Sequence, residues 1–244
     1  MASLPSLETL FAEDKERLDR LSLDVGPLYF DFSKTHLTAA SLAAFAERTD
    51  GVDFAASRKA LVDGEAINYS EGRAAEHMAE RGSGNADAVA LAKSRQSRMR
   101  GLIDAIEAGA FGEVKHLLHV GIGGSALGPK LLVDALGRED AKVDVHIASN
   151  VDGAALAEIF DKIDPATTML AVASKTFTTT ETLMNADSVI AWMREGGVSD
   201  PYGRVVALTA HPEKAVEWGV DETRILPFQE SVGGRYSIWS SIGF

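Results

Sequence analysis

The stretch Lys115-His-Leu-Leu-His-Val-Gly-Ile-Gly-Gly-Ser-Ala-Leu-Gly-Pro129 decides the fold of this chain. Its apolar run from Leu117 to Val120 has the length and composition of a buried strand. The run ends in a turn with three glycines, and leucines then follow at helical spacing, at positions 127, 131, 132 and 136. A strand, a glycine turn and a helix in this order aim backbone N–H groups at an anion. A tight turn that binds nothing has the same pattern, so the rest of the chain has to decide between them.

The composition describes an ordinary globular protein with an acidic surface. The chain has 244 residues, of which 45% are hydrophobic and 25% charged, enough for one large domain or two small ones. Its formal net charge is −12, and this argues against a nucleic-acid partner, which needs a basic face. A small anionic ligand is not excluded, because a local site can be positive on an acidic protein.

The chain contains no cysteine, which excludes disulfides, a thiolate nucleophile and a cysteine-based metal site. The N-terminus is acidic and amphipathic and has no basic and apolar leader pattern. No apolar run reaches the ~18 residues of a membrane span. We therefore expect a cytoplasmic protein with no membrane partner.

The first half of the chain predicts helices and irregular segments. A helix is expected over residues 1–26, an extended piece over 28–32, and further helices after Thr38, over 54–62, over 72–81 and over 87–110. Arg73 and His77 are four residues apart, so they share a face of the helix predicted there. An exposed polar face is sufficient to explain this pair.

After Gly112 apolar runs alternate with amphipathic segments. Strands are predicted at 116–120, 143–148, 168–173, 204–209 and 224–227, with helices near 125–136, 152–163, 179–195 and 212–218. Strands separated by helices predict an α/β fold, a doubly wound parallel five-stranded sheet with the flavodoxin-like order 2-1-3-4-5. We therefore expect an α/β domain at 113–244 and a helical region at 1–112 that packs on it.

In such a sheet the loops after the first and third strands share one crevice at the carboxyl edge. The first loop is Gly121 to Ser125. The second holds five hydroxyls and one lysine in seven residues, Ser174-Lys-Thr-Phe-Thr-Thr-Thr180, ahead of a helix. Hydroxyls, N–H groups, a helix dipole and the Lys175 cation suit a phosphate monoester. A capped helix start beside a solvated lysine is the alternative interpretation.

Nucleotide binding is less well supported. The first loop fits a dinucleotide fingerprint loosely, as Gly121-x-Gly123-x-x-Ala126. Such a site expects an acidic residue at the end of the second strand, about 20 residues on, but here Asp152 comes only after that strand. The Walker pattern G-x-x-x-x-G-K-[ST] does not occur.

A third segment, Gly233-Gly-Arg-Tyr-Ser237, follows the fifth strand near the same edge. Two glycines allow a close approach of the backbone. A guanidinium such as that of Arg235 suits a developing oxyanion. An ion pair that ties down the loop would explain the arginine equally well.

These segments together resemble the glucose-6-phosphate isomerase family. The resemblance rests on His119-Val-Gly-Ile-Gly-Gly-Ser-Ala-Leu-Gly-Pro129, on Ala173-Ser-Lys-Thr-Phe-Thr178 with Glu181-Thr182, and on the Gly233–Ser237 motif. It extends to Asp31-Phe-Ser-Lys34, to Ile67-Asn-Tyr-Ser-Glu-Gly-Arg73 and to Ser149-Asn-Val-Asp-Gly153, in the family's order. The matched region runs from about Leu28 to the last residue.

The resemblance implies an aldose–ketose isomerase of glycolysis and gluconeogenesis that interconverts glucose 6-phosphate and fructose 6-phosphate. It implies two sugar-isomerase (SIS) domains, a homodimer, and neither a metal nor an organic cofactor. Carried over by motif, it implies that Arg235 stabilises an enediolate and that Gly124 lets the backbone approach the sugar. The substrate phosphate would be held by Ser125, Ser174, Thr176 and Thr179. Lys175 would lie close to the substrate and be, with Arg235, a catalytic residue.

The family continues past the Gly-Gly-Arg motif into a second SIS domain and a C-terminal region, which carry the catalytic glutamate and a histidine and lysine associated with ring opening. The histidine comes from the partner subunit. This sequence stops at Phe244, so we expect an N-terminal fragment without the catalytic base. A stand-alone SIS module that binds sugar phosphates without catalysis is the alternative.

Overall fold

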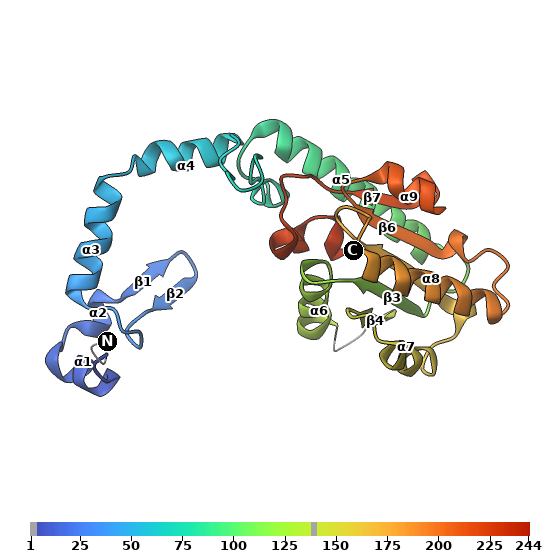
Figure 1. The fold of residues 1–244 in the computed structure, drawn as a ribbon, viewed down its shortest axis with the longest axis horizontal. Coiled ribbons are helices and arrows are strands. Elements are labelled where there is room, and N and C mark those ends of the chain that lie inside the picture. The colour runs from blue at the N-terminus through green and yellow to red at the C-terminus, as the bar shows by residue number, and fades with distance from the viewer. Residues whose placement is uncertain (1–3, 138–140) are drawn as a thin grey trace. The chain divides into compact units, whose positions relative to one another are not determined.

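The computed structural model describes residues 4–137 and 141–244. The chain forms two compact units, Met1–Arg58 and Lys59–Phe244 (Figure 1). The division of the chain into a helical region at 1–112 and an α/β domain at 113–244 remains a prediction. The long helix α5 (Ala86–Glu107), expected in the N-terminal region, belongs to the same compact unit as the sheet.

The first unit contains a β-hairpin where the sequence predicts the end of a helix. Helices α1 (Leu7–Glu13) and α2 (Arg17–Arg20) are followed by β1 (Ser22–Val25) and β2 (Leu28–Asp31), which pair antiparallel, and then by α3 (Ala39–Asp50). Gly26 adopts a φ of 59°, and a two-residue turn that begins with glycine favours hairpins over helices. The predicted helix over 1–26 is therefore wrong after residue 20, whereas Ser6 and Thr38 cap α1 and α3 as predicted.

The buried side chain of Arg17 fastens this unit together. It is 1% exposed. Its guanidinium donates to the carbonyl oxygens of Ser33 (2.8 Å), Thr35 (2.5 Å) and Leu37 (2.8 Å). A buried cation is tolerated when its donors are satisfied, so this arginine fixes the chain that follows the hairpin onto α2.

The second unit is built on the predicted sheet. Its strands are β3 (His116–Gly121), β4 (Asp144–Ala148), β5 (Thr168–Ala173), β6 (Val205–Thr209) and β7 (Ile225–Pro227), all parallel in the order β4-β3-β5-β6-β7. This confirms the doubly wound α/β fold and its strand order. All residues of β5 and β6 are buried, as expected for strands covered on both faces.

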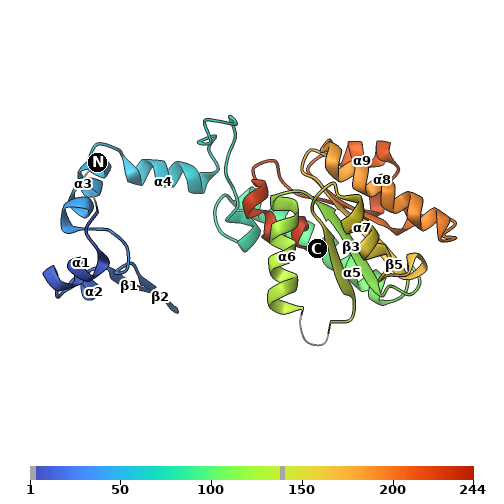
Figure 2. The ribbon, with the colours of Figure 1, turned by 60° about the horizontal axis from the view of Figure 1, so that its bottom comes forward.

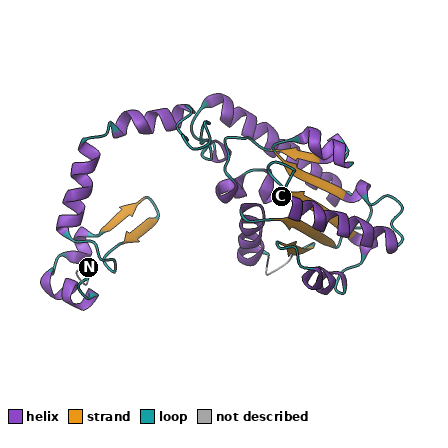
Figure 3. Cartoon of the chain, in the orientation of Figure 1, coloured by secondary structure: helices purple, strands orange, loops and turns teal. Residues whose placement is uncertain are grey.

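Helices cover both faces of the sheet (Figures 2 and 3). On one face, α7 (Gly153–Phe160), α8 (Thr180–Glu195) and α9 (Pro212–Trp218) pack on a core that includes Leu118 and Val172. On the other, α5 packs on Met169 and Leu208 beside the C-terminal 3₁₀ turns. Helix α6 (Gly124–Leu136) lies against β3, β4 and the 3₁₀ segment η5 (Gly234–Trp239). Among the described residues, no helix has the length and hydropathy to cross a membrane.

The helix predicted over 72–81 is wrong. Helix α4 (Phe54–Asp63) ends before it, and of the predicted turns only a 3₁₀ turn, η1 (Ala79–Arg81), forms. Asn68 and Arg73 pair as an antiparallel bridge around Gly72, which has a φ of 63°. The amide of Glu76 then donates to the carbonyl of Ser231 (3.1 Å). A distant acceptor has replaced the i−4 carbonyl that a helix would supply.

Candidate functional site

The first two predicted loops leave the sheet side by side. Strands β3 and β5 are neighbours in parallel register, with Gly121 opposite Ala173 at their carboxyl ends. A Cβ built on Gly121 would lie 2.8 Å from the Ser125 carbonyl oxygen and 3.1 Å from that of Ala173. The backbones of the two loops are therefore in contact where the loops begin, at the carboxyl edge of the sheet where doubly wound folds bind ligands.

The first loop places Ser125 in the opening turn of α6. Gly123 adopts φ 58° and ψ −123°, a combination open almost only to glycine. Ser125 is buried, and its carbonyl lies 2.7 Å from Nε2 of the buried His119. Because a carbonyl only accepts hydrogen bonds, this imidazole nitrogen carries a hydrogen. Burial lowers the pKa of His119, which keeps the ring neutral while it holds the turn.

The second loop holds its hydroxyls together. The Ser174 hydroxyl, almost fully buried, lies 3.1 Å from that of Thr179, and Thr178 donates to Thr176 (2.9 Å). Thr179 occupies the cap position of α8 but makes no capping hydrogen bond. The hydroxyls are therefore not consumed by a helix cap, which was the alternative interpretation of this segment.

A buried aromatic side chain anchors the same loop. Phe177 has a φ of 49°, uncommon for a residue other than glycine. Its ring is 3% exposed, packs in the core beneath α8, and meets Trp218 edge-on at 6.0 Å. Strain of this kind persists where the surroundings hold it in place. The anchor turns the chain so that Thr176 and Thr178, on either side of it, remain exposed.

Lys175 points to the segment before the third motif. Its ammonium donates to the Glu230 carbonyl (2.6 Å) and lies 3.4 Å from the Glu230 carboxylate. An oxygen of that carboxylate also lies 2.8 Å from Nε2 of His211. Lys175 therefore links the second loop to the segment that leads to Gly233. Its closeness to a substrate remains a prediction.

The third motif packs directly on the first. A Cβ on Gly124 would lie 2.3 Å from the carbonyl carbon and oxygen of Gly234 and 2.7 Å from the Arg235 amide nitrogen. Gly124 is therefore required for contact between the two turns, and its predicted approach to a sugar remains untested. Arg235 itself is exposed and forms no ion pair among residues 4–137 and 141–244. The alternative interpretation of Arg235 as a loop-fixing ion pair is thereby removed for the described part of the chain.

Sequence reasoning missed the side chains that hold these turns. His77 accepts a hydrogen bond from the Gly233 amide (2.8 Å), and Arg73 lies beside the same glycine, with Nη2 4.0 Å from a Cβ built there. The four-residue spacing of Arg73 and His77 is visible in the sequence, but the helix that it predicts does not form. For His119, the only signal was a polar residue within a buried strand.

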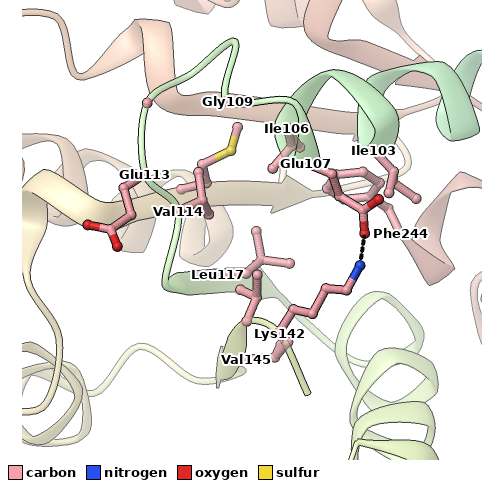
Figure 4. A pocket seen from close by; sticks show the side chains of 13 residues that line it. Ile103, Ile106, Glu107, Gly109, Glu113, Val114, Leu117, Lys142, Val145 and Phe244 are labelled. Atoms are coloured by element: carbon pink, nitrogen blue, oxygen red, sulfur yellow. Dashed lines mark hydrogen bonds and ion pairs between the residues drawn. The ribbon is translucent and has the colours of Figure 1, made fainter. Parts of the chain in front are cut away.

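A hollow of about 590 Å³ lies at the other end of the sheet (Figure 4). Apolar side chains from α5 and from the first residues of β3 to β5 line it, among them Ile106, Leu117 and Met169, and the Lys142–Glu107 ion pair (2.9 Å) lies at its wall. It contains none of the residues predicted to bind phosphate. The candidate site is therefore the meeting point of the three loops.

Comparison with known proteins agrees with this arrangement. A protein-family model described as phosphoglucose isomerase matches residues 31–244. Glucose-6-phosphate isomerases of Rhizorhabdus wittichii and Zymomonas mobilis are 63% and 61% identical over 239 residues, 98% of this chain and 48% and 47% of those proteins. The chain thus spans about half the length of the curated relatives it matches.

A solved structure shows the same fold. The crystal structure of a glucose-6-phosphate isomerase from Chlamydia trachomatis superposes with a TM-score of 0.80 at 25% identity. The match covers 98% of this chain and 48% of that one. The arrangement of elements is therefore similar over nearly the whole chain at low sequence identity.

Proposed function

The chain belongs to the phosphoglucose isomerase family, and on that premise we propose that it supplies the phosphate-binding half of an isomerase active site. The whole enzyme would interconvert glucose 6-phosphate and fructose 6-phosphate by moving a proton between C1 and C2 through an enediolate. The observation that carries the proposal is the meeting of three loops at one edge of the sheet, with Gly121 opposite Ala173 and Gly124 against Gly234.

The first two loops bind the substrate phosphate in this proposal. Ser125, Ser174, Thr176 and Thr179 supply hydroxyl donors, and the N-termini of α6 and α8 add partial positive charge. Lys175 adds a full charge at the border with the third loop. A phosphate monoester matches this set because its oxygens accept several hydrogen bonds at once.

Arg235 is assigned to the chemical step, in which it stabilises the enediolate. Arg235 is exposed and directly follows Gly234, the glycine that contacts the start of α6. A cation at this place can lower the energy of an enediolate oxygen. A module that only binds sugar phosphates would need the two phosphate loops but no such cation. The exposed Arg235 therefore favours the isomerase over the non-catalytic module.

On the family resemblance, the catalytic base lies in the half of the enzyme that these residues do not include. A histidine associated with ring opening would come from the partner subunit of the homodimer. We therefore expect the 244-residue chain to bind glucose 6-phosphate without measurable turnover. Isothermal titration calorimetry and an isomerase assay on the same sample test both expectations. Robust isomerisation by the 244-residue chain would contradict the assignment of the base to the other half.

Two substitutions in the full-length enzyme separate the assigned roles. Lys175→Ala should mainly raise KM, because it removes a charge that binds ground state and transition state alike. Arg235→Ala should mainly lower kcat, because its contact forms with the enediolate. Lys115→Ala is the matched control, since Lys115 lies at the opposite edge of the sheet, just before β3, and pairs only with Glu113 among the described residues. Equal effects at positions 175 and 115 would refute the phosphate site.

A further inference from the structure

Two histidine side chains, His119 and His77, each hold one of the glycine turns through a hydrogen bond at Nε2. In one of them this nitrogen donates, and in the other it accepts. Nε2 of His119 lies 2.7 Å from the Ser125 carbonyl, which only accepts. Nε2 of His77 lies 2.8 Å from the Gly233 amide, which only donates. His119 must therefore carry a hydrogen on Nε2, and His77 must not. The His119 bond can exist with a neutral or a charged ring, whereas the His77 bond requires a neutral ring.

The contact between His77 and Gly233 is close. A Cβ built on Gly233 would lie 3.1 Å from Nε2 of His77, so only glycine fits comfortably against the imidazole. The edge of the ring also meets Tyr236 at a centroid distance of 5.2 Å. His77 thus contacts the third motif on both sides of Arg235, at positions 233 and 236.

The motif is also held by the turn at the start of α6. Gly234 and the Arg235 amide lie against Gly124, with no room for a methyl group between them. The backbone from Gly233 to Arg235 is therefore clamped between His77 and α6. Contacts from both groups hold the backbone from which the exposed Arg235 side chain extends, and release of either contact frees that backbone to move.

The charges around His77 oppose its protonation. The groups that act on the ring are cations from two segments, Arg73, Arg81 and Lys175, while the Glu71 carboxylate is engaged by Arg73 and that of Glu230 by Lys175. Burial first, and then these three cations, lower the pKa of His77. The neutral ring that the Gly233 bond requires is therefore maintained at neutral pH.

We propose that His77 is a positioning residue for Arg235, and that only its neutral imidazole holds the Gly233–Arg235 turn in the arrangement that stabilises the enediolate. The inference rests on the proposed function of Arg235. In acid, His77 gains a hydrogen on Nε2, the Gly233 amide loses its acceptor, and two N–H groups face each other. The enzyme then keeps its phosphate site, but the turn that carries Arg235 is no longer held in place.

The kinetic test follows kcat and KM for glucose 6-phosphate between pH 5 and 8 in the full-length enzyme. His77→Ala should lower kcat by about 10- to 100-fold at every pH, the effect of a misplaced group, with KM changed by less than about threefold because the phosphate loops remain. In His77→Gln the amide oxygen can accept from Gly233 and does not titrate. This variant should regain most of kcat and lose the decline that the wild type shows in acid.

His119→Gln is the matched control. Its amide N–H can still donate to the Ser125 carbonyl, and since that bond does not need an unprotonated acceptor, the acid decline of kcat should remain. The proposal is overturned if His77→Gln retains the wild-type decline, or if His77→Ala has a wild-type kcat.

A second measurement does not depend on turnover. Hydrogen exchange of the Gly233 amide, expressed as a protection factor, should show protection at pH 7 and its loss as His77 takes up a proton, as followed by imidazole nitrogen shifts. His77→Gln should keep the protection in acid. A Gly233 amide that stays protected beside a charged His77 would refute the positioning role even if the isomerase assignment holds. Loss of protection in a protein that binds no sugar phosphate would instead refute the proposed function alone.

Discussion

Substitution of Gly124 by alanine tests the contact between the turn at the start of α6 and the Gly-Gly-Arg turn. The new methyl group would lie 2.3 Å from two backbone atoms of Gly234 and 2.7 Å from a third, on Arg235, where ordinary contacts are 3.4–4 Å. The turns would have to separate by roughly 1 Å, and overpacking against groups that cannot rotate away costs about 3 kcal/mol. Alanine returns at most ~1 kcal/mol through its higher helix propensity at the start of α6.

The net loss is therefore about 2 kcal/mol, and since each 1 kcal/mol shifts the melting temperature of a domain of this size by about 2–4 °C, we expect a decrease of about 4–8 °C. Circular dichroism during heating measures it, using the transition of the unit that contains the sheet. In the full-length enzyme, kcat should fall as well, because Arg235 moves with its turn.

Gly234→Ala is the matched control from the other side of the same contact. A Cβ on Gly234 meets nothing within 4 Å, and this glycine does not have a positive φ. Its melting temperature should stay within about 1 °C of the wild type, as for a neutral surface change. If Gly124→Ala melted with the wild type, or if both variants lost the same stability, close packing of the turns would not be the reason for glycine at position 124.

Three further changes have definite expected outcomes. Burial lowers the pKa values of His77, His119 and His146 in the folded state. The unfolded chain therefore binds more protons than the folded chain below the ordinary histidine pKa of about 6.5, and the free energy of unfolding should fall from pH 7 to pH 5. Urea unfolding across that range measures this free energy, and a flat profile would contradict the prediction. Arg17→Met removes three hydrogen bonds to backbone carbonyls, one buried and two partly buried, and should destabilise the Met1–Arg58 unit by about 3 kcal/mol. Limited proteolysis of that unit should accelerate, and unchanged cleavage would count against the predicted loss. Thr182→Val removes a fully buried hydroxyl that has no hydrogen-bond partner among the described residues. The substitution should stabilise the sheet unit by about 1 kcal/mol and raise the urea midpoint of unfolding. A lower midpoint would show that the hydroxyl has a partner.

Much of the sheet unit could be predicted because its signals are local. The segments from Leu117 to Val120 and from Met169 to Ala173 are apolar runs that end in glycine or hydroxyl residues, the pattern of strands covered on both faces. Their alternation with amphipathic segments fixes a parallel sheet, and its handed crossovers leave few strand orders. The nearness of the two loops proposed to bind phosphate follows from that order, since the loops after neighbouring strands emerge at the same edge of the sheet.

The predictions failed where short segments find their partners far away in the chain. The helical pattern at 72–81 was outweighed by the bond from Glu76 to Ser231, and the end of the first predicted helix by the pairing of β1 with β2. Such segments have weak intrinsic preferences, so tertiary contacts decide their conformation.

The sequence by itself determined the sheet, the order of its strands, and the two loops that meet at its edge, because periodicity and turn residues act within a few positions of each other. Only the tertiary structure decided that the backbone of Gly234 packs against Gly124 and leaves no room for a Cβ there. It also decided that His77 accepts a hydrogen bond from Gly233, which lies 156 positions further along the chain. Those contacts depend on where the folded chain brings its distant parts, and neither residue type nor spacing along the chain records that.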